Sequence, residues 1–237
     1  IGTMIYALMR PCGKTVVMRA FNLEQLFVNI QKYRINSLAL VPTMYVYMLN
    51  YADADKYDLS SVDYGICGSA PLAVETWNRF KEKFGGEIAE GWGLTEAAAN
   101  DSLNPIRGLK KVGSIGKPMV DMEMKIFDEN DRELPQGQEG EIVLRGPMVM
   151  KGYWGKPGET AEVIKNGWLH TGDIGYVDED GYFFITDRKK DIIIKGGENI
   201  SPRSIEEVLY QHPKISEAAV VGIKDPVYGE DVKAFVS

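Results

Sequence analysis

The chain has 237 residues, of which 44% are hydrophobic and 26% are charged, a composition typical of a soluble globular protein. A formal net charge of −7 argues against a nucleic-acid-binding protein, because phosphate contacts need a basic face and the sequence shows none. Cys12, Cys67, His170 and His212 are too few and too widely spaced for a disulfide framework, a zinc site or a histidine-based metal site, and this cysteine usage fits a reducing, cytoplasmic compartment.

Strand and helix patterns alternate along the first part of the chain. The predicted strands are residues 15–20, 37–42, 62–70 and 87–92. The predicted helices are residues 22–34, 42–52 and 72–84. Asn22 is the expected N-cap of the first helix, and Pro42 lies near the start of the second. Strands separated by helices indicate βαβ units, so we expect an α/β region with a parallel sheet covered by helices.

The pattern changes near Lys110, where short alternating strands separated by Gly and Pro begin. They include a hairpin whose turn is DEDG at residues 178–181, and they predict an antiparallel, β-barrel-like subdomain. After Asp191 a strand, a helix and two strands follow, which suits a small α+β module. We therefore expect three parts. They are an α/β subdomain at residues 1–109, a β-barrel-like subdomain at 110–189 and a small α+β C-terminal domain at 190–237.

The two ends of the sequence predict an internal piece of a longer protein. The chain opens with IGTMIYALMRPCGK, which has no initiator Met and no basic leader, and its apolar run is too short to span a bilayer. It closes on VKAFVS, a strand-like segment without a following turn. We therefore expect a fold truncated at both ends and no transmembrane segment.

Two loops of the α/β region are candidates for ligand binding. The first, CGSAPL at residues 67–72, exposes backbone groups after a parallel strand, although an ordinary strand-to-helix turn explains it more simply. In the second, EGWGLTEAAAN at residues 90–100, Trp92 offers a face for a purine. Thr95 could bind phosphate oxygens and Glu96 could bind Mg²⁺. Alternatively Trp92 is a core residue, Thr95 an N-cap and Glu96 a partner of the helix dipole.

Two further loops lie after residue 110. In HTGDIGY, Asp173 follows a glycine in a tight turn and could accept the hydroxyls of a ribose, or it could only cap the turn. His170 beside it is interpreted as a structural hydrogen-bonding residue. In ITDRKKDIIIKGGENIS, at residues 185–201, Arg188 is a candidate partner for an anion or a ribose. A solvated turn between two strands is the alternative for this charged run.

Taken together and in order, the four loops resemble the adenylate-forming superfamily. The motifs are GSAP, WGLTE, TGD and DRKKD, and GSIGKPM, GEIVLRGPMVMKGYW and NGWLHTGDIGYVDEDGYFFITDR add to them. The likeness covers essentially the whole chain and is closest to acyl-CoA synthetases, 4-coumarate-CoA ligases and beetle luciferase. It implies a ligase that activates a carboxylic acid, fatty or aryl, with MgATP to an acyl-adenylate. The acyl group then passes to the thiol of coenzyme A, so the expected co-substrates are ATP, Mg²⁺ and coenzyme A.

The resemblance also assigns roles to residues. The implied nucleotide-binding residues are Gly68, Ser69, Ala70, Pro71, Glu90, Gly91, Trp92, Gly93, Leu94, Thr95, Asp173 and Arg188. Thr95 would contact phosphate and Glu96 would hold Mg²⁺, so these two are the implied catalytic residues. Asp173 would accept the ribose hydroxyls with help from Arg188. Trp92 stands where the family more often has Tyr, which keeps stacking but loses the hydrogen bond of the phenol. The alanines at 97–99 would line the acyl pocket.

The charged run at residues 185–201 resembles the hinge of this superfamily, with Lys190 at the pivot. The small domain is expected to rotate after adenylation, and an exposed charged hinge has no apolar surface to repack. Gly196 and Gly197 would then help to form the tunnel for coenzyme A. Asn199 stands where some members have Arg, so a contact between it and the nucleotide is not assigned.

Two elements of the superfamily are missing from this sequence, namely the phosphate loop upstream and a late lysine of the small domain. Since such donors supply much of the stabilisation in phosphoryl chemistry, we expect the 237-residue piece alone to turn over poorly. Two alternatives stay open. One is an adenylating enzyme that does not use coenzyme A, such as an acyl-AMP ligase loading a carrier protein or a luciferase-like oxygenase. The other is a non-catalytic nucleotide-binding module. The acid and the oligomeric state are not determined by the sequence.

Overall fold

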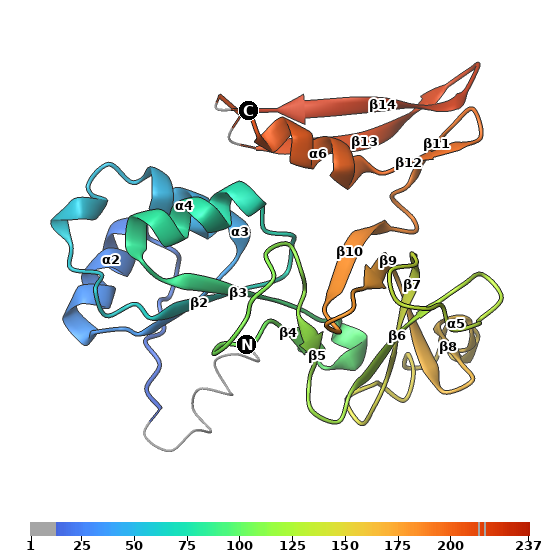
Figure 1. Cartoon of the computed structure of the whole chain (residues 1–237), viewed down its shortest axis with the longest axis horizontal. Coiled ribbons are helices and arrows are strands. Elements are labelled where there is room, and N and C mark those ends of the chain that lie inside the picture. Colours follow the sequence, from blue (N-terminus) through green and yellow to red (C-terminus); the bar gives the residue numbers. More distant parts are fainter. Residues whose placement is uncertain (1–12, 213, 216) are drawn as a thin grey trace. The chain divides into compact units, whose positions relative to one another are not determined.

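The computed structural model describes residues 13–212, 214, 215 and 217–237. The prediction for Cys12 therefore lies outside the described residues. The chain divides into two compact units, with the division between Gly116 and Lys117. Figure 1 colours the elements in chain order. Among the helices of the described residues, none is both long enough and apolar enough to cross a membrane.

The first unit is built on a sheet in which three parallel strands are followed by an antiparallel one. In spatial order the strands are β1 (Ser37–Leu40), β2 (Tyr64–Cys67), β3 (Glu87–Trp92) and β4 (Ser102–Leu103). The helices are α2 (Leu23–Tyr33), α3 (Pro42–Asn50), α4 (Val74–Phe84) and the short 3₁₀ helices η1 (Ala54–Lys56) and η2 (Thr95–Ala97). The predicted βαβ order is confirmed, and it places the ends of β2 and β3 at the same edge of the sheet.

Local signals in the sequence explain these helices. The side chain of Asn22 accepts a hydrogen bond from the backbone N–H of Gln25 at 2.8 Å, as expected for an N-cap. Pro42 lies at the first position of α3, where its missing N–H costs nothing. The core between helices and sheet is aromatic and aliphatic. Its fully buried members include Phe27, Ile30, Tyr45, Met48 and Phe80.

The strand predicted at residues 15–20 is wrong. The structure gives this segment no strand assignment, and Val16 and Val17 are 39% and 66% exposed. The prediction rested on the β-branched side chains alone, and β propensity does not make a strand without a neighbouring strand to pair with.

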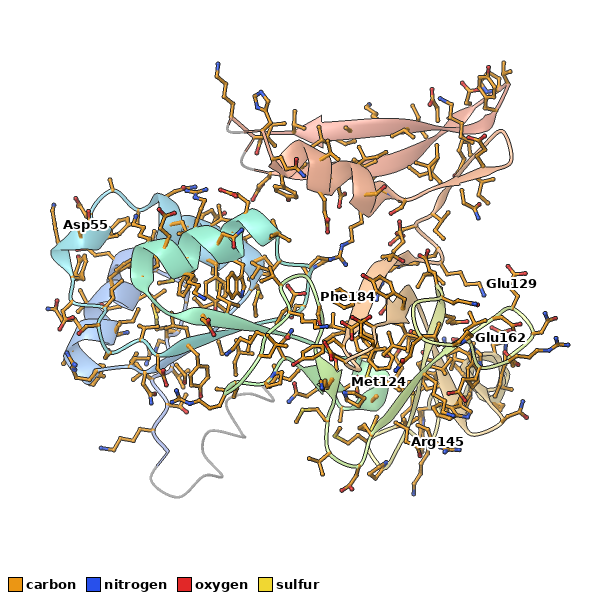
Figure 2. The ribbon with its side chains drawn as sticks, viewed as in Figure 1. Asp55, Met124, Glu129, Arg145, Glu162 and Phe184 are labelled. Atoms are coloured by element: carbon orange, nitrogen blue, oxygen red, sulfur yellow. The ribbon has the colours of Figure 1, made fainter. Side chains whose placement is uncertain are left out.

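The second unit contains an antiparallel sheet with the order β10–β9–β7–β6, and β8 also pairs with β9. The strands are β6 (Glu123–Phe127), β7 (Gly140–Arg145), β8 (Ile164–Lys165), β9 (Trp168–Val177) and β10 (Phe183–Arg188). The short strand β5 (Lys117–Pro118) begins the unit, and the helix α5 (Pro157–Val163) precedes β8. Met124, labelled on β6 in Figure 2, is one of the buried residues. The predicted DEDG turn is confirmed, because Gly181 N donates to Asp178 O at 3.0 Å.

A second antiparallel sheet follows, with the order β12–β11–β14–β13. Its elements are β11 (Ile193–Lys195), β12 (Glu198–Ile200), α6 (Pro202–Tyr210), β13 (Ala218–Asp225) and β14 (Gly229–Val236). The sequence predicted every one of these elements except β12. Gly196 and Gly197, with φ angles of 61° and 90°, form a two-residue hairpin turn between β11 and β12. Positive φ at both central residues is typical of a type I′ turn, which favours glycine.

The expected combination of an α/β region, an antiparallel β region and a small α+β module is therefore confirmed. The domain boundaries at 109/110 and 189/190 stay predictions.

Candidate nucleotide-binding site

The two loops predicted in the α/β region lie side by side. Cys67 pairs with Glu90 in the parallel register of β2 and β3, so the residues that follow each strand leave from the same edge. A Cβ atom on Gly68 would approach the carbonyl oxygen of Gly91 to 3.0 Å, so glycine at this position favours the close approach of the two segments. The structure thus brings residues 68–71 and 90–94 together.

Glu90 links these two loops directly. Its side chain is buried, with 6% exposure, and its Oε2 atom accepts a hydrogen bond from Leu72 N at 3.0 Å. Its backbone oxygen accepts hydrogen bonds from both N and Nδ2 of Asn104. Cys67 is fully buried beside this carboxylate, and burial and the charge of Glu90 both raise the pKa of the thiol. Cys67 therefore stays protonated and is not a nucleophile.

The segment from Trp92 to Asp101, called here the Thr-Glu loop, follows β3. It contains η2, and no side chain caps that helix, so the alternative in which Thr95 serves as a side-chain N-cap is not what the structure shows. The side chain of Thr95 is exposed and that of Glu96 is partly buried. Ala97 is fully buried, whereas Ala98 and Ala99 are exposed. The alcohol of Thr95 is therefore accessible to a ligand.

The position of Glu96 is compatible with a magnesium ion bound together with a nucleotide. Within the described part of the chain, no three His, Cys, Asp or Glu side chains gather into a metal-binding group. A single carboxylate suits Mg²⁺, which usually takes one or two protein carboxylates and completes its shell with phosphates and water. Glu96 is the candidate carboxylate ligand of this ion. Phosphate oxygens of the nucleotide and water would supply the other ligands.

In the second unit, Asp173 and Arg188 form an ion pair across neighbouring strands. They are direct partners in the antiparallel register of β9 and β10, and Arg188 Nε donates to Asp173 Oδ1 at 2.8 Å. The side chain of Asp173 is 2% exposed and that of Arg188 is 47% exposed. The two residues predicted to bind the ribose are therefore brought together, with the carboxylate inside and the guanidinium at the surface.

The expected tight turn at Asp173 is wrong, because Asp173 lies within strand β9, at a bulge where the register with β7 shifts. This bulge is held by a residue that the sequence analysis did not single out. Glu141 on β7 accepts a hydrogen bond from Gly172 N at 2.9 Å and lies 3.1 Å from His170 Nδ1. Lys189 Nζ is 3.7 Å from the same carboxylate. His170 is thus a structural partner, as expected. The only sequence signal for Glu141 was a charged residue inside the strand-like motif GEIVLRG.

Other contacts shape this sheet. The rings of Tyr176 and Phe184 stack across β9 and β10 with a centroid distance of 5.0 Å, and Phe184 is labelled in Figure 2. Gly175 precedes Tyr176 on β9, and a Cβ atom there would collide with the carbonyl oxygen of Phe184. On β7, Arg145 donates two hydrogen bonds to Glu123 and lies over the ring of Trp168. These contacts fix the strands that carry Asp173 and Arg188.

The segment predicted as a hinge is a charged, exposed turn. Residues 188–191 are exposed, and the N–H groups of Asp191 and Ile192 both donate to Arg188 O. Beyond the turn, Arg203 on α6 donates to Ile185 O at 2.6 Å, and Ser201 donates to Thr186 O at 3.3 Å. The α+β module is therefore attached to the edge of β10 by two side-chain hydrogen bonds.

Comparisons with known proteins bear on these loops. The model of the AMP-binding enzyme family matches residues 1–154, and that of the AMP-binding enzyme C-terminal domain matches residues 204–237. The chain is 49% identical over 208 residues to a long-chain-fatty-acid–CoA ligase from Bacillus subtilis, covering 87% of this chain and 37% of that protein. It is 40% identical over 226 residues to a feruloyl-CoA synthase from an Amycolatopsis species, covering 94% of this chain and 46% of that protein.

A solved structure is also similar. The amide bond synthetase from Marinactinospora thermotolerans superimposes with a TM-score of 0.84 at 34% identity, over 92% of this chain and 46% of that one. The chain thus spans less than half the length of each of these three proteins. Their similarity extends over 87–94% of the chain.

Proposed function

This chain belongs to the AMP-binding enzyme family, and from that premise we propose that its protein is an acyl-CoA synthetase. In the first step a carboxylate oxygen attacks the α-phosphorus of ATP, and the bond to the leaving pyrophosphate breaks. In the second step the sulfur of coenzyme A attacks the acyl carbon, the thiol loses its proton, and AMP leaves. The observation that carries the proposal is the pairing of residues 68–71 with residues 90–94 in a chain 49% identical to a long-chain-fatty-acid–CoA ligase.

The residues of the first unit have these proposed roles. Gly68, Ser69, Ala70 and Pro71 and the backbone of residues 90–94 form the adenine pocket, with Trp92 as its aromatic face. Thr95, whose hydroxyl is exposed, donates to a phosphate oxygen. Glu96 holds Mg²⁺, which when bound neutralises charge on the phosphates as pyrophosphate leaves.

In the second unit, Asp173 binds the ribose hydroxyls. Its pairing with Arg188 supports this proposal, because the guanidinium orients the buried carboxylate. In dinucleotide-binding folds an acidic side chain accepts a hydrogen bond from a ribose hydroxyl in the same way. Glu141 supports the role indirectly, since it fixes the preceding Gly172 N–H.

For the second step, Lys190 is the proposed pivot of a domain rotation. The exposure of residues 188–191 supports a hinge that can change its backbone angles without disturbing a core. Rotation would have to break the hydrogen bonds from Arg203 and Ser201 to the edge of β10. Gly196 and Gly197, at the tip of an exposed hairpin, are the proposed contact with the thiol tunnel. The proposed compartment is the cytoplasm, and the domain division at 109/110 and 189/190 is part of this proposal.

A second candidate function is adenylation without coenzyme A. The likeness to a protein named an amide bond synthetase, and not a CoA ligase, favours it. The two candidates share the first step and differ in the acceptor.

The test is a chimera in which this chain replaces the matching 208-residue segment of the Bacillus subtilis ligase. We expect ATP–pyrophosphate exchange that depends on a fatty or aryl acid, followed by thioester formation with coenzyme A. The matched control is Thr95→Val, which keeps the shape of the side chain and should lose exchange while leaving the melting temperature unchanged. Amide formation without thioester formation would favour the second candidate. A folded chimera without exchange would overturn both.

A further inference from the structure

The side chain of Asp101 closes the Thr-Glu loop. Leu94 N donates to Asp101 Oδ2 at 2.8 Å, and Asp101 N donates to Trp92 O at 2.9 Å. Asp101 therefore holds the first limb of the loop through both its side chain and its backbone. Ala97 N and Ala99 N also donate to Leu94 O, at 3.1 and 2.6 Å, so Leu94 is the residue on which the loop closes.

The closed loop holds its backbone in an unfavourable conformation. Ala98 and Ala99 have φ angles of 62° and 69°, in the left-handed region that side chains disfavour. Each such residue costs on the order of 1–2 kcal/mol. A Cβ atom on Gly93 would lie 2.5 Å from backbone atoms of Ala99 and Asn100, so the two limbs touch along the backbone. Such a conformation persists only where the surrounding contacts determine it.

The burial of the Asp101 carboxylate costs free energy of folding. Its side chain is fully buried, and its Oδ1 atom has no hydrogen-bond partner among the described residues. Burial raises the pKa of Asp101 to about 6, although the hydrogen bond from Leu94 N opposes this rise. An asparagine would close the loop without placing a carboxylate in the interior. The contribution of Asp101 to the loop is therefore the acceptor oxygen that it offers to Leu94 N, and not its charge.

The anchoring of Leu94 by Asp101 also affects the position of Thr95 and Glu96 at the tip of the loop. Thr95 and Glu96 follow Leu94 directly, so the direction of the Leu94 N–H determines where their side chains leave β3. In a reaction carried by positioning and electrostatics, a displacement of these groups by about 1 Å can reduce the rate on the order of 100-fold.

We propose that Asp101 is the positioning residue of the Thr-Glu loop: its carboxylate anchors Leu94 and so places Thr95 and Glu96 against the phosphates of the nucleotide. The effect of Asp101 on catalysis rests on the proposed function. Its effect on the conformation of the loop rests only on the hydrogen bonds of the loop. Asp101 itself touches neither substrate nor metal.

Two substitutions separate positioning from general stability. Asp101→Ala removes the acceptor, whereas Asp101→Asn keeps an oxygen for Leu94 N. The matched control is Leu49→Ala, a cavity in the core of the same unit, where Leu49 is 5% exposed and lies outside the loop. In the chimera we expect Asp101→Ala to lower kcat of ATP–pyrophosphate exchange by about 10- to 100-fold with little change in KM for ATP. Asp101→Asn should restore kcat to within about threefold, and Leu49→Ala should leave kcat unchanged.

Hydrogen exchange on the 237-residue chain gives an independent readout. The amides of Leu94, Ala97 and Ala99 should exchange faster in Asp101→Ala, but not in Asp101→Asn or Leu49→Ala. Wild-type kcat or unchanged loop exchange in Asp101→Ala would overturn the inference, as would an Asp101→Asn protein as slow as Asp101→Ala. If the unsubstituted chimera folds but lacks exchange activity, the proposed function fails. The loop exchange rates then decide the positioning role on their own.

Discussion

Removing Arg188 or Asp173, the two partners of the ion pair, should lower the free energy of unfolding by very different amounts. Arg188→Ala leaves a carboxylate that is 2% exposed, whereas Asp173→Ala leaves a guanidinium that is 47% exposed and can be hydrated. Removing one partner of a buried pair costs about 3–5 kcal/mol when the other charge stays buried. Removing Asp173 should cost only about 1–2 kcal/mol, the value of a hydrogen bond to a charged group at a partly exposed site.

The assay is urea unfolding followed by the fluorescence of Trp168, which is 7% exposed and lies on β9 together with Asp173. Phe substitutions at the other three of the four tryptophans make Trp168 the only reporter, so the signal follows the second unit alone. The double variant, with Ala at both positions, should be no less stable than Arg188→Ala, because the buried carboxylate has been removed. Equal costs for the two single variants, or a larger cost for Asp173→Ala, would refute the reasoning.

Four further results are expected. Ala99→Gly should raise the free energy of unfolding by about 1 kcal/mol, because φ at this position is 69°; a lower urea midpoint would contradict it. Gly196→Ala should lower stability by about 1 kcal/mol, measured in the same way, since φ is 61° and a Cβ atom would lie 3.3 Å from Tyr228; no change would argue against the hairpin turn. Because the pKa of Asp101 is raised to about 6, its contribution to stability is full below pH 4 and is lost as the pH rises through 6. Asp101→Asn should therefore gain up to about 3 kcal/mol over the parent chain between pH 4 and 7, and a gain independent of pH would contradict this assignment. Lys190→Pro in the chimera should slow thioester formation more than adenylation, because proline fixes φ at the pivot; equal slowing of both steps would count against a hinge.

The elements that the sequence predicted well depend on local signals. Asn22 caps α2, Pro42 starts α3, and the periodicity of the apolar residues selects the buried faces. The strand at residues 15–20 failed because a strand needs a partner, which propensity does not supply. The hairpin of β11 and β12 was missed because Gly196 and Gly197 were interpreted only as a ligand contact, although two adjacent glycines also predict a type I′ turn.

In the candidate site, too, some contacts could be predicted from local sequence signals and others could not. The order of strands and helices predicts that residues 68–71 and 90–94 meet, because parallel strands end at one edge of the sheet. The pairing of Asp173 with Arg188 follows from the register of a predicted hairpin. Glu141 acts on a bulge of β9 that lies 31 residues away in the sequence, and the role of Asp101 depends on the closed path of its loop. Contacts of this kind arise from the register between strands and from loop geometry, which no local pattern encodes.

The most direct test of the account is a calorimetric titration of the chimera with a non-hydrolysable palmitoyl-adenylate analogue. We expect binding that weakens by about 1.5–3 kcal/mol in Asp173→Ala, the loss of a charge-assisted hydrogen bond to the ribose. We also expect acetyl and cinnamoyl analogues to bind with different affinities, because the acyl group would lie in the same proposed pocket. A folded chimera that binds no analogue, or an Asp173→Ala chimera that binds as tightly as the parent, would contradict the central claim that this chain carries the site for an acyl-adenylate.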